Sequence, residues 1–202
     1  MRRALAGLTL LALLGCSGEP APAPTADPQQ DPGPPRPHDQ EAPPVAPLTA
    51  AELQQRAEEA LGPKAMMTRL TPPLPASWPD AGGRVVFLAY RREPLPSGRV
   101  RYLVRPPRHA VEVDVGTGAA RVVELPAADE PLGEVERRGG APDGLDAAAQ
   151  ALVDVVAGRR AADEARSTLA PYARWLEAEP EVAGDLRSRP EHAAFVSWVS
   201  GR

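Results

Sequence analysis

The sequence predicts an α+β fold: a helix packed on a four-stranded antiparallel meander, followed by two to four C-terminal helices. Three observations carry this prediction. Apolar residues recur at helical spacing over residues 50–61, valines alternate with charged residues around position 113, and helical spacing returns after residue 145. A helix, then strands, then more helices is the order of an α+β domain, which we place at residues 48–202.

The first helix has signals for both its start and its end. Thr49 followed by Glu52 is close to a capping box, in which each side chain binds the other residue's backbone N–H. Leu53 and Ala57 follow at helical spacing, and Gly62-Pro63 ends the pattern. We therefore expect a helix over residues 50–61.

Four runs rich in β-branched residues predict the meander, and they cover residues 85–91, 100–105, 111–115 and 121–125. We expect the proline-rich residues 106–109 to form a turn, because proline cannot donate a ladder hydrogen bond. This turn sets Val104 opposite Val111 on the inner face and Arg101 opposite Asp114 on the outer face.

The C-terminal part of the domain, residues 145–202, is predicted to be helical. Apolar residues recur at helical spacing over residues 146–157, 162–179 and 190–200. Pro171 lies inside the second stretch, where it kinks or splits a helix. The polar, glycine-rich segment before this part is expected to be a loop.

The N-terminus resembles the signal peptide of bacterial lipoproteins. Arg2 and Arg3 precede a short apolar run that ends in Leu-Leu-Gly-Cys at residues 13–16, and Cys16 is the single cysteine of the chain. The resemblance implies that the signal peptide, residues 1–15, is cleaved off before Cys16. It also implies a diacylglycerol on the thiol of Cys16 and acylation of its amino group. The alternative is an ordinary secretory peptide with a chance cysteine.

This resemblance implies a lipid-anchored protein of the cell envelope. Two or more acyl chains give stable anchoring, whereas one binds reversibly. Ser17 follows the cysteine, as in lipoproteins sorted to the outer membrane, so we expect an outer-membrane protein facing the periplasm, with the cell surface as the alternative.

Residues 16–47 comprise the lipidated cysteine and a proline-rich spacer that we expect to be disordered. Eleven of the 29 residues from 19 to 47 are proline, and this stretch holds no aromatic residue. Such a chain averages about 30 Å end to end and reaches about 90 Å when extended. It is expected to hold the domain away from the bilayer; the alternative is a proline-rich ligand for a groove on a partner.

A second resemblance lies in the segment Val-Glu-Val-Asp-Val-Gly-Thr-Gly at residues 111–118. Asp114, Thr117 and Gly118 match the Asp-x-x-Thr-Gly turn that precedes the last strand of PepSY-like, cystatin-like α+β domains. The resemblance covers residues 48–126 and implies a module that binds or inhibits peptidases, or an envelope sensor. The same turn chemistry also arises independently in unrelated hairpins.

Motifs of catalysis and metal binding are missing from the sequence. It has three histidines without metal-ligand spacing, no Gly-x-Ser-x-Gly elbow and no phosphate loop. Without Arg2 and Arg3, 21 basic residues face 27 acidic ones, a net charge of −6 that argues against nucleic-acid binding. We expect a protein that is not an enzyme and that uses no metal or cofactor.

Arginines are concentrated in the predicted first strands of this acidic chain. The candidate partner-binding residues are Arg91, Arg92, Arg99, Arg101, Arg105 and Arg108. Either they meet an anionic lipid, a glycan or an acidic envelope protein, or they pair with carboxylates on neighbouring strands and are solvated. The expected register gives Arg91, Arg92 and Arg99 no obvious acidic neighbour.

Two functions remain for such a chain. One is a tethered, non-catalytic interaction or inhibitor module that binds an envelope protein. The other is a structural accessory subunit of a larger envelope complex. A binding protein for a small ligand is less supported, because eight aromatic residues offer little for a pocket.

Overall fold

The computed structural model describes residues 46–95, 101–128, 130–136 and 141–201. Cys16 and the predicted spacer up to residue 45 lie outside them. The elements are α1 (Ala50–Leu61), the 3₁₀ helix η1 (Gly62–Met67), β1 (Thr68–Leu70), β2 (Leu74–Pro75), β3 (Arg84–Pro94), β4 (Arg101–Arg105), β5 (His109–Asp114), β6 (Ala120–Glu124), β7 (Gly133–Glu136), α2 (Leu145–Val156), α3 (Ala162–Ala165), α4 (Ala170–Ala178), α5 (Pro180–Ser188) and α6 (Pro190–Val199).

The order of a helix, an antiparallel sheet and C-terminal helices is confirmed, but the sheet has seven strands and is not a four-stranded meander. β3 is its centre, because it pairs antiparallel with β1, β2, β4 and β5. β5 also pairs with β6, and β4 also pairs with β7. The strands missing from the prediction, β1, β2 and β7, have only two to four residues each, too few for an alternating pattern to stand out.

The predicted hairpin between β4 and β5 is wrong. Both strands run antiparallel to β3 and therefore parallel to each other, on successive stretches of it. Val104 pairs with Arg92, whereas Val111 pairs with Phe87. Pro106 and Pro107 are buried and interrupt the pairing with β3 instead of reversing the chain.

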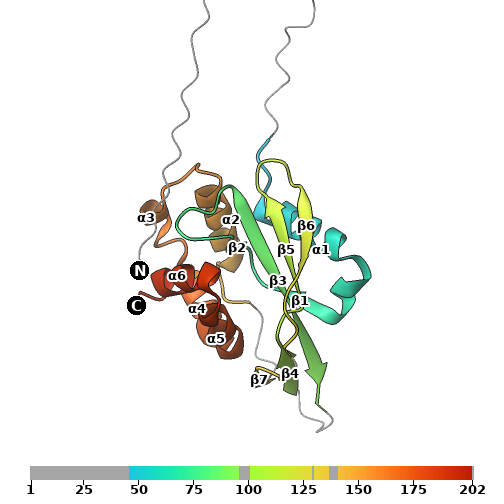
Figure 1. Ribbon diagram of the computed structural model, residues 1–202. Helices are drawn as coiled ribbons and strands as arrows, with labels where there is room; N and C mark the ends of the chain where they lie inside the picture. The colour runs from blue at the N-terminus through green and yellow to red at the C-terminus, as the bar shows by residue number, and fades with distance from the viewer. Residues whose placement is uncertain (1–45, 96–100, 129, 137–140, 202) are drawn as a thin grey trace, which may run out of the picture. The chain divides into compact units, whose positions relative to one another are not determined.

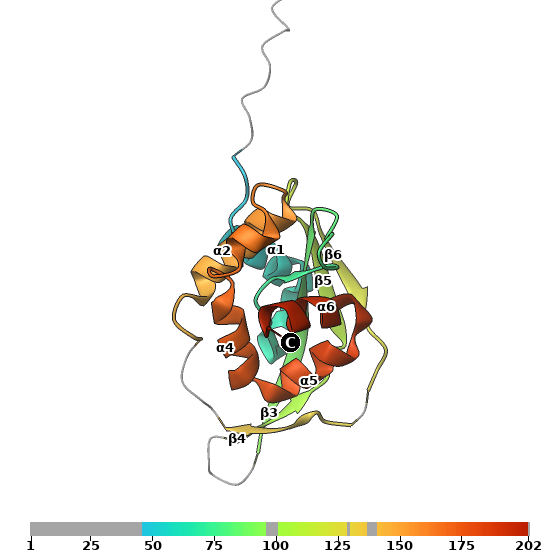
Figure 2. The same cartoon turned by 90° about the vertical axis from the view of Figure 1, so that its left-hand side faces the viewer.

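Helices lie on both sides of this sheet (Figure 1). α1 packs against β5 and β6, and its buried residues include Leu53 and Ala57. The C-terminal helices lie on the opposite side, where the hydroxyl of Tyr172 donates to the carbonyl of Pro73 at 2.6 Å. Figure 2 shows α4, α5 and α6 in front of β3. The first half of β3 is therefore buried on both faces.

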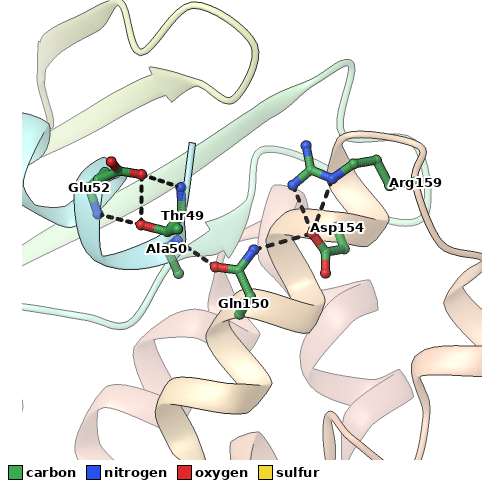
Figure 3. A network of polar contacts seen from close by, with 6 residues as sticks. All are labelled: Thr49, Ala50, Glu52, Gln150, Asp154 and Arg159. Atoms are coloured by element: carbon green, nitrogen blue, oxygen red, sulfur yellow. Dashed lines mark hydrogen bonds and ion pairs between the residues drawn. The ribbon is translucent and has the colours of Figure 1, made fainter. Parts of the chain in front are cut away.

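The N-terminus of α1 has the predicted capping box and is also bound to α2 (Figure 3). The Thr49 hydroxyl accepts from the Glu52 N–H at 3.2 Å, and the Glu52 carboxylate accepts from the Thr49 N–H at 2.7 Å. The Ala50 N–H donates to the side chain of Gln150 at 2.9 Å. Gln150 in turn donates to Asp154, which also binds Arg159.

The C-terminal part has five helices where two to four were expected. Pro171 splits the predicted 162–179 helix into α3 and α4, and it lies in the first turn of α4, where its missing N–H costs nothing. α5 was not expected, and β7 lies within the segment predicted to be a loop. None of the described helices is long and apolar enough to cross a membrane.

The hairpin of β5 and β6 agrees with the sequence. Val111, Val113 and Val115 are buried, whereas Glu112 and Asp114 are partly exposed. The Asp114 carboxylate accepts from the backbone N–H of Gly116 at 3.0 Å and from that of Thr117 at 2.8 Å. Hydrogen bonds from Thr117, followed by the one from Gly116, lower the pKa of Asp114.

Candidate functional site

The two adjacent arginines of β3 point to opposite faces of the sheet, as the pleat requires. Arg92 lies on the face covered by the C-terminal helices. Its guanidinium donates to both carboxylate oxygens of Glu179, at 2.8 and 2.7 Å, and the two side chains are 20% and 14% exposed. Arg92 is therefore tied to the junction of α4 and α5.

Arg91 lies on the other face, which α1 leaves open at this end of the sheet. It forms an ion pair with Glu93, and Arg105 reaches the same carboxylate at 3.3 Å. The expectation that Arg91 and Arg92 lack acidic neighbours is wrong, since their partners are Glu93 and Glu179.

The remaining candidate arginines have different surroundings. Arg101 pairs with Glu134 of β7 at 3.7 Å and not with Asp114, because β4 lies beside β7 rather than β5. Arg108 lies in the three-residue link between β4 and β5. Arg99 lies outside the described residues.

Three of the candidate arginines line one pocket of about 460 Å³. Arg91, Arg105 and Arg108 are joined there by Lys64 of η1 and His109 of β5. The pocket also has an apolar wall, to which Ala89, Pro106 and Ala128 contribute. We call this site the basic pocket.

The sheet register explains why these residues meet. Ala89 and Arg91 are two positions apart and therefore lie on the same face of β3. Arg91 also pairs directly with Arg105 of β4. The strand pairing then stops at Pro106 and resumes in β5, so that Arg108 and His109 follow within a few residues. η1 begins at the Gly62 end of α1 and brings Lys64 to the same place.

Cationic groups dominate this pocket. Among the residues described in its lining, four carry a positive charge and none carries a carboxylate. Glu93 lies beside it, and the hydrogen bond from Arg91 lowers the pKa of Glu93; desolvation opposes this shift and Arg105 reinforces it. The ammonium of Lys64 lies 3.1 Å from Nε2 of His109, so this nitrogen accepts a hydrogen bond from Lys64.

Sequence reasoning missed Lys64, Glu93 and His109 as parts of one site. Lys64 is the only lysine of the chain, and arginine is used at the other basic positions. That usage is the one signal that marks Lys64. His109 was assigned to a turn, and its place in β5 follows only once β4 and β5 are aligned on the same strand.

Metal-ligating and buried titratable groups also occur elsewhere in the described part of the chain. It contains no cluster of three His, Cys, Asp or Glu side chains able to hold a metal ion. His192 is 2% exposed, and its Nδ1 has no hydrogen-bond partner within the described structure. Burial lowers its pKa, which is the behaviour of a neutral core histidine.

Comparisons with protein-family models, curated proteins and solved structures gave no match to this chain.

Proposed function

We propose that the chain is a lipid-anchored protein of the bacterial cell envelope that acts as a non-catalytic interaction or inhibitor module. The observation that carries the proposal is the basic pocket at the end of the sheet that α1 leaves open. Elsewhere on the described surface, ion pairs join two or three side chains, as Arg84 and Arg121 do with Glu112, and such pairs are common on protein surfaces. In the basic pocket, four cations from four segments line one hollow.

The anchor belongs to the same proposal. Acylated Cys16 holds the protein in the outer membrane, facing the periplasm, and the spacer of residues 16–47 lets the domain reach partners tens of ångströms away. The turn between β5 and β6 resembles the Asp-x-x-Thr-Gly turn of PepSY-like domains, a resemblance that implies peptidase binding or inhibition, or envelope sensing. Both features favour a tethered binding module over a free enzyme.

Photo-crosslinking in intact cells tests the interaction. A crosslinker placed at Ala128 lies in the wall of the basic pocket, and one at Ala147 lies on an exposed position of α2. The proposal expects one dominant envelope protein to be captured from Ala128 and not from Ala147. Replacing Lys64 and Arg108 by Ser is expected to remove that product.

The matched control variant replaces Arg56 and Arg121 by Ser, which removes the same charge from exposed positions outside the pocket. If both double variants keep the product, the pocket is not the binding surface. A stoichiometric complex that survives the loss of Lys64 and Arg108 favours the alternative, a structural accessory subunit of an envelope complex.

A separate variant tests the anchor. Cys16→Ser removes the thiol that the diacylglycerol would occupy, so the protein is expected to move from the membrane fraction to the soluble periplasmic fraction. Continued membrane association of the Cys16→Ser protein contradicts the lipid anchor and leaves the pocket experiment intact.

A further inference from the structure

We propose that the basic pocket binds a phosphoryl group carried on a small apolar body, either a soluble phosphate ester or a lipid headgroup. This inference rests on the proposed function and specifies what the interaction surface recognises. The pocket volume of about 460 Å³ suits a ligand of that size, since small-molecule sites usually enclose a few hundred Å³.

The number of hydrogen-bond donors is the first argument. A guanidinium carries five N–H donors, whereas a carboxylate has about four lone-pair sites. Arg91 and Arg105 share Glu93, so one carboxylate faces the donors of two guanidiniums. Arg91 is about half exposed, so those of its donors that do not bind Glu93 meet solvent and can bind an anion in the pocket without displacing Glu93.

The arrangement of the cations is the second argument. A planar carboxylate matches one guanidinium fork, whereas a tetrahedral phosphoryl group presents three oxygens in different directions. The cations around the pocket come from η1, from β3 and β4, and from the link before β5. Several approaches of this kind fit a phosphoryl group better than a single carboxylate.

The apolar wall is the third argument. Ala89 and Pro106 form the core side of the pocket, and Ala128 adds exposed apolar surface to its wall. A bare inorganic ion leaves such a wall uncovered. An organic group attached to the phosphoryl buries against it, which adds affinity in proportion to the apolar area covered.

The affinity of the full chain for phenyl phosphate, measured by titration calorimetry in nonionic detergent, tests the inference. Phenylacetate carries a carboxylate on the same ring, and we expect it to bind at least about fivefold more weakly. Replacing Lys64 and Arg108 by Ser is expected to weaken phenyl phosphate binding about tenfold or more, since each charge-assisted hydrogen bond is strong. The control variant, in which Arg56 and Arg121 are replaced by Ser, is expected to bind like the unmodified chain.

Vesicle binding by the Cys16→Ser chain distinguishes the two sources of the phosphoryl group. This variant is used so that no acyl anchor contributes to binding. Pocket-dependent binding to phosphatidylcholine vesicles only when they contain phosphatidic acid assigns a lipid headgroup. Binding of phenyl phosphate without vesicle binding assigns a soluble ester.

Equal binding of phenyl phosphate and phenylacetate overturns the phosphoryl assignment, as does equal loss in both double variants. Thermal unfolding of each variant shows whether a loss of binding comes from misfolding, and a single Lys64→Gln change then provides a milder test. A crosslinked envelope protein that persists at Ala128 when phosphate binding fails preserves the proposed function and removes this inference alone.

Discussion

The two halves of β3 belong to one continuous strand but differ in how far the rest of the protein covers them. From Val85 to Tyr90 every side chain is buried, because α1 covers one face and the C-terminal helices cover the other. From Arg91 onward one face stays against the helices through Arg92 and Glu179, and the other opens into the basic pocket. The buried half of β3 therefore ends where α1 gives way to η1 and the basic pocket.

The largest expected effect on stability comes from the buried half of β3, Val85 to Tyr90. Phe87 is fully buried, and Phe87→Ala is expected to lower the free energy of unfolding by about 4 kcal/mol, from lost apolar transfer and the cavity left behind. Urea denaturation measures this. Val122→Ala, at an exposed position of β6, is the control and should cost less than about 0.5 kcal/mol. Similar losses in both variants contradict the division between core and surface.

The comparison becomes sharper at the adjacent arginines. Arg92→Ala leaves the Glu179 carboxylate with a longer contact of 3.6 Å to Arg69, and we expect a loss of about 2 kcal/mol. Arg91→Ala removes a pair whose arginine is about half exposed, and it should cost less than about 0.5 kcal/mol. Urea unfolding of the two variants gives the difference.

A double-mutant cycle with Glu179→Gln isolates the contribution of the Arg92–Glu179 pair. A coupling energy near zero indicates that Arg92 contributes through packing alone. Equal losses for Arg91→Ala and Arg92→Ala contradict the assignment of the two side chains to faces of different burial.

Local sequence signals predicted α1 and the β5–β6 hairpin well. The capping box at Thr49 and the Asp114 turn depend on residues within four positions of each other, so their chemistry can be read directly from the chain. The alternating valines of β5 likewise identify a strand with one inward face.

Non-local pairing caused the errors. Pro106 and Pro107 read as a turn, but a buried proline pair can also interrupt a strand, and only the partner strand decides between the two. Arg92 pairs with Glu179, which lies between α4 and α5, and the sequence did not predict α5. The basic pocket depends on the alignment of β4 and β5 along β3, which is why its arginines were found and its geometry was not.

The β5–β6 turn should show an intermediate effect. Gly118 has a φ of 70°, and a Cβ placed there lies 2.8 Å from Cδ1 of Leu48. Gly118→Ala is therefore expected to cost about 1.5 kcal/mol, from left-handed strain and displacement of Leu48. Urea unfolding measures it, and Gly184→Ala on α5, where a Cβ meets nothing within 4 Å, is the control. A neutral Gly118→Ala contradicts the close approach of Leu48.

The smallest expected effect tests the burial of His192, a titratable residue of α6. Burial lowers the pKa of His192 below its ordinary value of 6.5; Glu191 opposes this shift and Arg189 adds to it. The folded state therefore keeps His192 neutral while the unfolded chain takes up a proton below pH 6.5. Its stabilising contribution is complete above that pH and is lost as the pH falls towards the lowered folded pKa.

For one histidine the loss between about pH 7.5 and 6 is at most about 0.8 kcal/mol. Urea unfolding at both values measures the slope, and His192→Leu is expected to flatten it, whatever the variant does to absolute stability. If the two proteins respond equally to pH, His192 is solvated in the folded state. The C-terminal helices then do not exclude water from the face of the sheet that they cover, and the contrast between the two halves of β3 loses its physical basis.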